Sequence, residues 1–166
     1  MNTPKLPQKL IEIASREIGV EEIDGTNCGP QVNEYKAATT LPAKESWPWC
    51  AAFVAWVVKK AMEASEIAES ATFKRPKTAG AFDFENWSKR QGAETQTKRD
   101  PGDDVKAGDI VIFKFSHIGI AVEDANGNTV ACVEGNTDAD GSREGGGVFR
   151  KTRKLSQIRT RIRFTI

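Results

Sequence analysis

The spacing of apolar residues predicts four helices in the first part of the chain. Across 6–18 apolar residues recur at nearly every third or fourth position, which is the period of an amphipathic helix, and Gly19 follows as a stop. Because proline is tolerated in a first helical turn, we expect a short helix over 30–38. The most complete apolar stripe predicts a buried helix over 50–64, and a further helix is expected over 81–89.

After Gly108 the pattern changes to the two-residue alternation of β-strands. Asn126-Gly127 is a strong tight-turn pair between the second and third expected strands, whereas the polar stretch 91–106 is interpreted as a loop. Helices followed by an antiparallel sheet make an α+β fold, and a chain of 166 residues suits a single domain over 1–166. The five expected strands cover 110–115, 117–122, 129–134, 147–151 and 158–166.

Composition is ordinary for a globular protein, but the charge is unevenly distributed. The chain is 39% hydrophobic and 28% charged, with a formal net charge of +1. Residues 141–166 nevertheless contain eight Lys or Arg and one Glu, a local excess of +7. Such a stretch either binds an anionic polymer or forms a solvated strand face. The chain carries no zinc-finger spacing and no aromatic RNA-binding motif, so we expect no nucleic-acid partner.

The N-terminal residues 1–7 lack the apolar stretch of about 7–15 residues that a secretory signal needs. No apolar run approaches the roughly 18 residues that span a bilayer. We therefore expect synthesis in the cytoplasm without a signal peptide and no stable membrane insertion. Action outside the membrane would then depend on release by another factor.

Three cysteines are present, and their positions favour one reactive thiol. No Cys-x-x-Cys pair occurs, which argues against zinc or a thioredoxin-like motif, and an odd number argues against a disulfide framework. Cys50 stands at the expected start of the main helix, where free N–H groups and the helix dipole favour a thiolate. The alternative for Cys50 is an inert, buried apolar cysteine. We expect Cys28 and Cys132 to be structural.

His117 is the only histidine in the chain, and it begins an expected strand. If Asn126-Gly127 forms a two-residue turn, His117 faces Asn136 on the next strand, and Gly119 faces Glu134. Glu134 then lies diagonal to His117 on the same face, within reach of a long side chain. A slip of one residue would put the two side chains on opposite faces.

This register brings together groups that acyl-transfer chemistry needs. Either Glu134 or Asn136 could orient the imidazole, leaving the other ring nitrogen of His117 to take the Cys50 proton. Side chains at positions 119 and 121 are small and share the face of His117. We expect these two positions to let the Cys50 helix approach the sheet closely.

Several segments resemble those of CHAP amidohydrolases, a papain-like branch of the NlpC/P60 superfamily. The sequence Trp-Pro-Trp-Cys-Ala-Ala-Phe-Val at 47–54 resembles the nucleophile segment, and 108–120 resembles the histidine strand. Val-Glu-Gly-Asn-Thr at 133–137 resembles the third element, and 141–148 is similar to a version found in phage and prophage lysis proteins. The resemblance extends over 10–153.

The resemblance implies a papain-like CHAP fold, with N-terminal helices packed on a five- to six-stranded antiparallel sheet. It implies a peptidoglycan hydrolase that cleaves a stem-peptide amide bond as an N-acetylmuramoyl-L-alanine amidase or peptide endopeptidase. By resemblance, Cys50 is the nucleophile, His117 the base, Glu134 the orienting acid and Asn136 a fourth member of the site. Some relatives bind calcium in a loop of alternating acids. The segment 21–24 lacks that spacing, so we expect no metal and no cofactor.

Four further residues are candidates for substrate binding. Trp47 and Trp49 flank the nucleophile segment and could form a platform for sugar or peptide. Tyr35 and Asn27 could line the groove. For each of these side chains, packing within the fold is the competing interpretation.

Three alternatives to a phage endolysin remain open at this stage. One is an NlpC/P60-type enzyme, whose third residue is usually a second histidine, which this chain lacks. Another is a non-catalytic module of the same fold that binds cell wall or a protein partner. The last is a secreted antibacterial amidase effector, which would have an immunity protein as partner. In the endolysin interpretation, we expect a monomer that acts on bacterial peptidoglycan after release.

Overall fold

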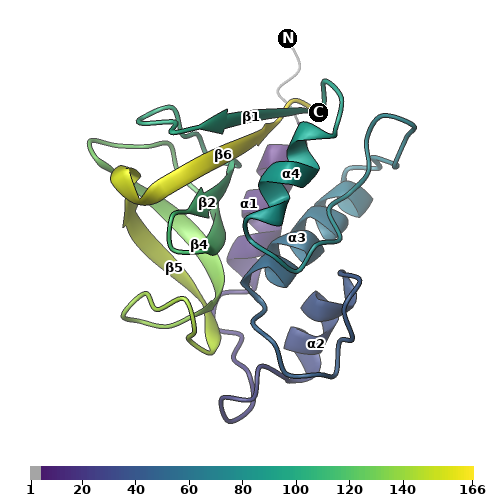
Figure 1. Cartoon of the computed structure of the whole chain (residues 1–166), viewed down its shortest axis with the longest axis vertical. Helices are drawn as coiled ribbons and strands as arrows, with labels where there is room; N and C mark the ends of the chain where they lie inside the picture. The colour runs from purple at the N-terminus through teal and green to yellow at the C-terminus, as the bar shows by residue number, and fades with distance from the viewer. Residues whose placement is uncertain (1–4) are drawn as a thin grey trace.

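A computed structural model describes residues 5–166, which form four helices followed by a sheet (Figure 1). The helix over 50–64 is confirmed at both ends, and the other three lie within a few residues of their expected bounds. The first helix ends two residues before position 18, and Gly19 follows in the left-handed region with φ of 98°. The helices are α1 (Lys5–Arg16), α2 (Pro30–Ala37), α3 (Cys50–Ala64) and α4 (Asp83–Lys89).

The six strands form one antiparallel sheet in the order β1-β6-β2-β3-β4-β5. The predicted α+β class is therefore confirmed. A short 3₁₀ turn, Leu155–Gln157, joins the last two strands. The strands are β1 (Thr95–Arg99), β2 (Ile110–Phe113), β3 (His117–Ala121), β4 (Thr129–Thr137), β5 (Gly147–Lys154) and β6 (Ile158–Phe164).

The interpretation of 91–106 as a loop was wrong for Thr95–Arg99, which pairs with β6 as an edge strand. None of its five residues is buried, so the strand lacks the alternation of apolar and polar positions that reveals a strand in a sequence. Two of its members are charged, as is common on exposed edges.

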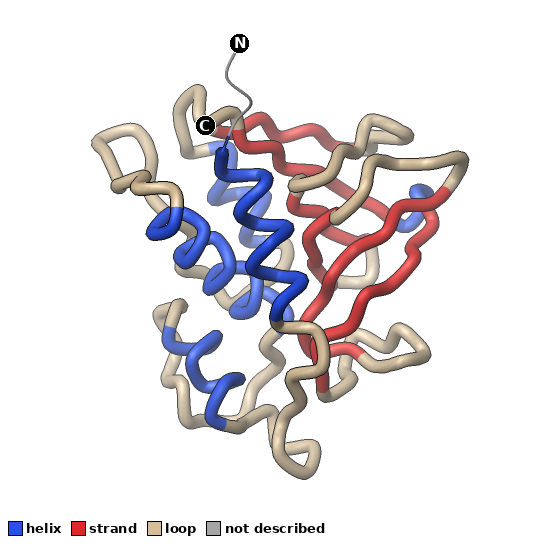
Figure 2. Tube along the Cα trace, turned by 180° about the vertical axis from the view of Figure 1, so that it is seen from behind, coloured by secondary structure: helices blue, strands red, loops and turns tan. Residues whose placement is uncertain are grey.

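The helices α1 to α4 lie to one side of the sheet, as Figures 1 and 2 show from opposite directions. The larger apolar cluster lies between these helices and the sheet face that carries Ile118, Ile120 and Val133. A smaller cluster, including Ala121 and Cys132, covers the opposite face. Burial on both faces explains why the central strands are apolar almost throughout. None of the helices in residues 5–166 is long and apolar enough to cross a membrane.

The basic excess near the C-terminus is partly neutralised by acids elsewhere in the fold. Arg161 and Arg163 of β6 both form ion pairs with Asp104. Arg150 of β5 pairs with Glu123 in the same way. This stretch therefore supplies intramolecular ion pairs as well as a solvated face, and it is less free for an anionic polymer than its sequence suggests.

The close approach between α3 and the sheet occurs at Gly135, and the expectation that positions 119 and 121 allow it was wrong. Ala121 belongs to the cluster on the far face of the sheet. A Cβ on Gly135 would lie 2.8 Å from Cβ of Phe53 and 2.9 Å from Cζ3 of Trp49. The absent side chain of Gly135 therefore sets how closely β4 packs against the start of α3.

We expect Gly135→Ala to lower the free energy of unfolding by about 1–3 kcal/mol, because helix atoms near the backbone cannot move away from the added methyl. Urea unfolding followed by circular dichroism measures the effect. Gly80→Ala is the matched control, since a Cβ there meets only the exposed carboxylate of Asp83, at 2.7 Å. Equal stability of the two variants would contradict tight packing at Gly135.

Candidate active site

Cys50 is the first residue of α3, and its position is fixed through its neighbour Trp49. The backbone N–H of Trp49 donates to Oδ1 of Asn136 at 2.7 Å, and the Trp49 carbonyl accepts from the N–H of Phe53 at 2.9 Å. The side chain of Cys50 is nearly buried, with 7% of the residue exposed. N–H groups of a first helical turn have no acceptor within the helix, so the thiol lies beside free donors and the positive end of the dipole.

His117 is fully buried, and its Nε2 lies 2.9 Å from Oε1 of Glu134. The predicted register between β3 and β4 is confirmed, since Ala121 pairs with Cys132. A Cβ on Gly119 would lie 2.6 Å from Cγ of Glu134. Gly119 therefore provides the space through which the Glu134 side chain crosses toward the ring.

The second ring nitrogen of His117, Nδ1, is buried and has no aligned hydrogen-bond partner within residues 5–166. Because Glu134 engages Nε2, Nδ1 is the ring nitrogen left to exchange a proton with another group. Burial opposes a charge on the ring, but interactions with Cys50 and Glu134 outweigh it and raise the pKa of His117 to about 9. This raised pKa favours the protonated imidazole at neutral pH, with the Glu134 carboxylate at Nε2.

Two phenylalanine rings stack on the imidazole of His117 and restrict its orientation. Phe113 and Phe115 stack on His117 with ring centroids 6.0 Å and 5.9 Å away and interplanar angles of 21° and 17°. Phe113 is also the cross-strand partner of His117. We did not single out either residue in the sequence, because apolar residues in a strand are usual. The adjacency of Phe115 to the Ser116-His117 segment was the available clue.

Glu134 makes a second, charged contact that sequence reasoning missed. Nε of Arg153 donates to Oε2 of Glu134 at 2.9 Å, and Nη2 donates to Oε1 at 2.5 Å. Burial alone would raise the pKa of Glu134, but hydrogen bonds from Arg153 and His117 lower it overall. Arg153 stands in a run of basic residues, so the sequence spacing could not show which of them pairs with Glu134.

Asn136 makes no hydrogen bond to the imidazole, so Glu134 is the one of the two candidates that orients the ring. Its Oδ1 accepts from Trp49, and its Nδ2 donates to the carbonyl of Gly145 at 2.5 Å. The backbone of Asn136 has a positive φ of 55°, which asparagine tolerates better than most residues. Asn136 therefore connects the end of β4 to the residue preceding Cys50.

Trp49 and Tyr35, which we expected near a substrate groove, are both fully buried. Their rings pack with centroids 5.6 Å apart. The indole N–H of Trp49 donates to Glu22 at 2.9 Å, and the hydroxyl of Tyr35 donates to Glu17 at 2.5 Å. Large aromatic residues near the start of a helix are equally suited to supporting it, and these two do so.

Trp47 and Asn27 lie in loops that a buried lysine holds together. Lys36 is fully buried, and its Nζ donates to the carbonyls of Asn27 at 2.7 Å and Glu45 at 2.6 Å. The same ammonium lies 5.2 Å from the ring centroid of Trp47, which is partly exposed. Trp47 and Asn27 thus remain candidates for contact with substrate, on loops with a fixed position.

The other two cysteines are not part of this arrangement. Cys132 is fully buried, and burial together with the charge of Glu134 raises the pKa of its thiol. Cys28 is half-buried with its sulfur 3.4 Å from Nζ of Lys36. Within residues 5–166, no group of three or more His, Cys, Asp or Glu side chains is arranged to hold a metal ion.

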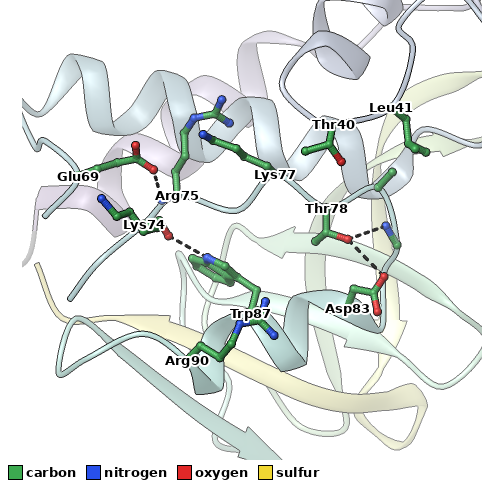
Figure 3. Close-up of a pocket in the computed structure, with 12 residues that line it drawn as sticks. Thr40, Leu41, Glu69, Lys74, Arg75, Lys77, Thr78, Asp83, Trp87 and Arg90 are labelled. Carbon is green, nitrogen blue, oxygen red and sulfur yellow. Dashed lines mark hydrogen bonds between the residues drawn. The ribbon is translucent and has the colours of Figure 1, made fainter. Parts of the chain in front are cut away.

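A separate hollow of about 840 Å³ lies beside α4, and its lining includes none of Cys50, His117 and Glu134. Figure 3 shows the indole N–H of Trp87 donating to the carbonyl of Lys74 at one side of this hollow. Its charged lining residues are Glu69, Lys74, Arg75, Lys77, Asp83 and Arg90. The hollow is thus distinct from the place where Cys50, His117 and Glu134 lie.

The CHAP domain family matches residues 42–136, a range that is more than half of the chain and includes Cys50, His117, Glu134 and Asn136. The chain belongs to the CHAP domain family. A comparison of this CHAP protein with curated proteins finds no match.

The fold of this CHAP protein is similar to a solved structure described as the crystal structure of a wild-type endolysin, LysIME-EF1. The TM-score is 0.56 and the sequence identity 19%, over 98% of this chain and 64% of that chain. At this identity the likeness concerns the fold. The CHAP protein therefore spans 64% of the length of the endolysin chain it matches.

Proposed function

We propose that this CHAP protein is a cysteine hydrolase that cleaves an amide bond in the stem peptide of peptidoglycan. The observation that carries the proposal is the position of the buried His117 ring, with Glu134 on Nε2 at 2.9 Å and Nδ1 left without an aligned hydrogen-bond partner within residues 5–166. Family membership and the fold shared with an endolysin support peptidoglycan as the substrate. The bond cleaved is that of an N-acetylmuramoyl-L-alanine amidase or a peptide endopeptidase.

The reaction we propose is acyl transfer through a thioester. The Cys50 thiolate attacks the carbonyl carbon of the scissile amide, and the protonated His117 gives its Nδ1 proton to the leaving nitrogen. Glu134 accepts a hydrogen bond from Nε2 throughout and thereby keeps Nδ1 directed at the sulfur. The neutral imidazole then takes a proton from water, which hydrolyses the thioester and regenerates the thiolate–imidazolium pair.

The backbone N–H of Cys50 is the proposed oxyanion donor. It belongs to the first turn of α3 and so lacks an acceptor within the helix. A donor fixed in the backbone can stabilise the negative oxygen without reorganisation at the moment of reaction. Asn136 contributes indirectly, because its bond to Trp49 fixes the residue before Cys50.

Release of the protein to the cell wall completes the proposal. The solved structure with the same fold is described as an endolysin, which favours a lytic role over that of a binding module. Digestion of purified peptidoglycan, with mass spectrometry of the new termini, tests the proposal. New amino termini without new reducing ends would support amide cleavage, and unchanged peptidoglycan would refute it.

We expect Glu134→Gln to lower the rate of peptidoglycan cleavage by about 10²-fold or more, since the amide retains the shape but loses the charge that stabilises the imidazolium. Initial rates of turbidity loss measure the effect. Glu123→Gln, which neutralises an exposed acid on the surface, is the control and should retain the wild-type rate. A wild-type rate in Glu134→Gln would remove Glu134 from the mechanism.

A further inference from the structure

Arg153 is nearly buried and donates two hydrogen bonds to the carboxylate of Glu134. Its Nε and Nη2 donate to different oxygens of the carboxylate, at 2.9 Å and 2.5 Å. The Glu134 side chain is fully buried, and only 9% of the Arg153 side chain is exposed. Oε1 of Glu134 therefore accepts from both Arg153 and His117.

The guanidinium of Arg153 is itself fixed from several directions. Nη1 and Nη2 both donate to the carbonyl of Gly141 at 3.1 Å. The guanidinium carbon lies 5.3 Å from the ring centroid of Phe113 and 5.2 Å from that of Phe115. These are the two rings that stack on His117, so the guanidinium and the imidazole both pack against the same two phenylalanines.

A buried carboxylate with one partner can rotate about its side chain or take up a proton. The charge of arginine balances that of the carboxylate, and its planar fork matches both carboxylate oxygens, which restricts rotation in a way that a single ammonium cannot. We propose that Arg153 is a positioning residue, which holds Glu134 ionised and in the plane that keeps Oε1 on Nε2 of His117. Its effect on Cys50 passes through Glu134 and His117.

This role deepens the proposed function, and its kinetic consequence rests on that function, but its structural consequence can be measured without substrate. The protein has a single histidine, so ¹⁵N-labelled histidine gives NMR signals from one ring. In the wild type we expect a slowly exchanging Nε2–H signal, because that proton lies in a buried hydrogen bond. In Arg153→Met we expect the signal to disappear through exchange with water.

The second readout is alkylation of Cys50 by iodoacetamide at neutral pH, followed by mass spectrometry of the Cys50 peptide. Without Arg153, Glu134 takes up a proton or turns away from Nε2, so the imidazolium loses its counter-charge and alkylation should slow by about tenfold or more. Arg161→Met is the matched control, because Arg161 is also a buried, ion-paired arginine, on β6. It should lower the melting temperature while leaving both readouts unchanged.

Arg153→Lys keeps the charge and loses the fork, so we expect intermediate values of both readouts. If Arg153→Met does not fold, the two readouts of Arg153→Lys test the proposal instead. Wild-type values in a folded Arg153→Met, or in Arg153→Lys when the methionine variant is unfolded, would overturn the proposal. Equal losses in Arg161→Met would overturn it as well, since they would reflect general destabilisation. Changed readouts in a protein that never cleaves peptidoglycan would uphold the role of Arg153 and refute the hydrolase.

Discussion

Cys50→Ala should reduce peptidoglycan cleavage to background, a loss of about 10⁴-fold or more, while the melting temperature changes little. The size of the effect follows from the chemistry, because no acyl intermediate forms without the sulfur. Removing a thiol that is 7% exposed at the end of a helix leaves a small space and does not disturb the pairing of β3 with β4. Turbidity loss and analysis of released fragments measure the activity.

Two variants separate a nucleophile from a structural cysteine at position 50. Cys50→Ser keeps the size of the side chain, and it should be nearly as inactive as the alanine variant because a hydroxyl ionises far less readily than a thiol. Cys28→Ser is the matched control, since Cys28 is also a free cysteine and makes no hydrogen bond to His117 or Glu134. It should keep wild-type activity. Lytic activity in Cys50→Ala would rule out the thioester mechanism.

The register that joins His117 to Glu134 could be predicted, although the turn was placed one residue too early. The tight turn consists of Gly127-Asn128, flanked by a bridge between Asn126 and Thr129. Between the pair Ala121–Cys132 and the bridge Asn126–Thr129, the chain after β3 has two more residues than β4. These two extra residues offset the one-residue error in the position of the turn. An excess of two residues preserves which face each side chain occupies, so the prediction remained correct.

The face of the sheet that α3 covers could not be predicted from the strands. All five residues of β3 are buried, so alternation carries no information about which face meets a helix. Small residues occur on both faces: Glu134 fills the space at Gly119, which we expected to admit the helix, whereas Gly135 contacts Phe53. Only the packed structure distinguishes a glycine that admits a side chain from one that admits a helix.

The ion pair of Arg153 with Glu134 could not be predicted from the sequence, for a different reason. Arg153 pairs across the sheet with Val130, four residues from Glu134, so its side chain must run diagonally to reach the carboxylate. Nearest-neighbour pairing rules do not extend that far. The burial of Trp49 could not be predicted either, because an aromatic residue beside Cys50 can either face a ligand or support the helix.

His117→Gln should lower cleavage by roughly 10³-fold or more, because no other group in the described site can exchange a proton with both the sulfur and the leaving nitrogen. Glutamine retains a donor that can reach Glu134, so we expect the variant to fold. Turbidity loss measures the rate, and alkylation of Cys50 at neutral pH should slow as well, since the imidazolium no longer stabilises the thiolate. Wild-type alkylation in this variant would show that Cys50 is not paired with His117.

The same variant tests the protonation of the ring through the pH dependence of stability. The pKa of His117 rises from 6.5 to about 9 on folding, with burial opposing the change and Cys50 and Glu134 producing it. A group whose pKa is raised by folding contributes stability that is complete below its unfolded value and is lost as the pH passes its folded value. The stability advantage of the wild type over His117→Gln should therefore shrink between pH 6.5 and 9. Urea unfolding across this range measures it, and a constant difference would mean that the folded protein holds the imidazole neutral.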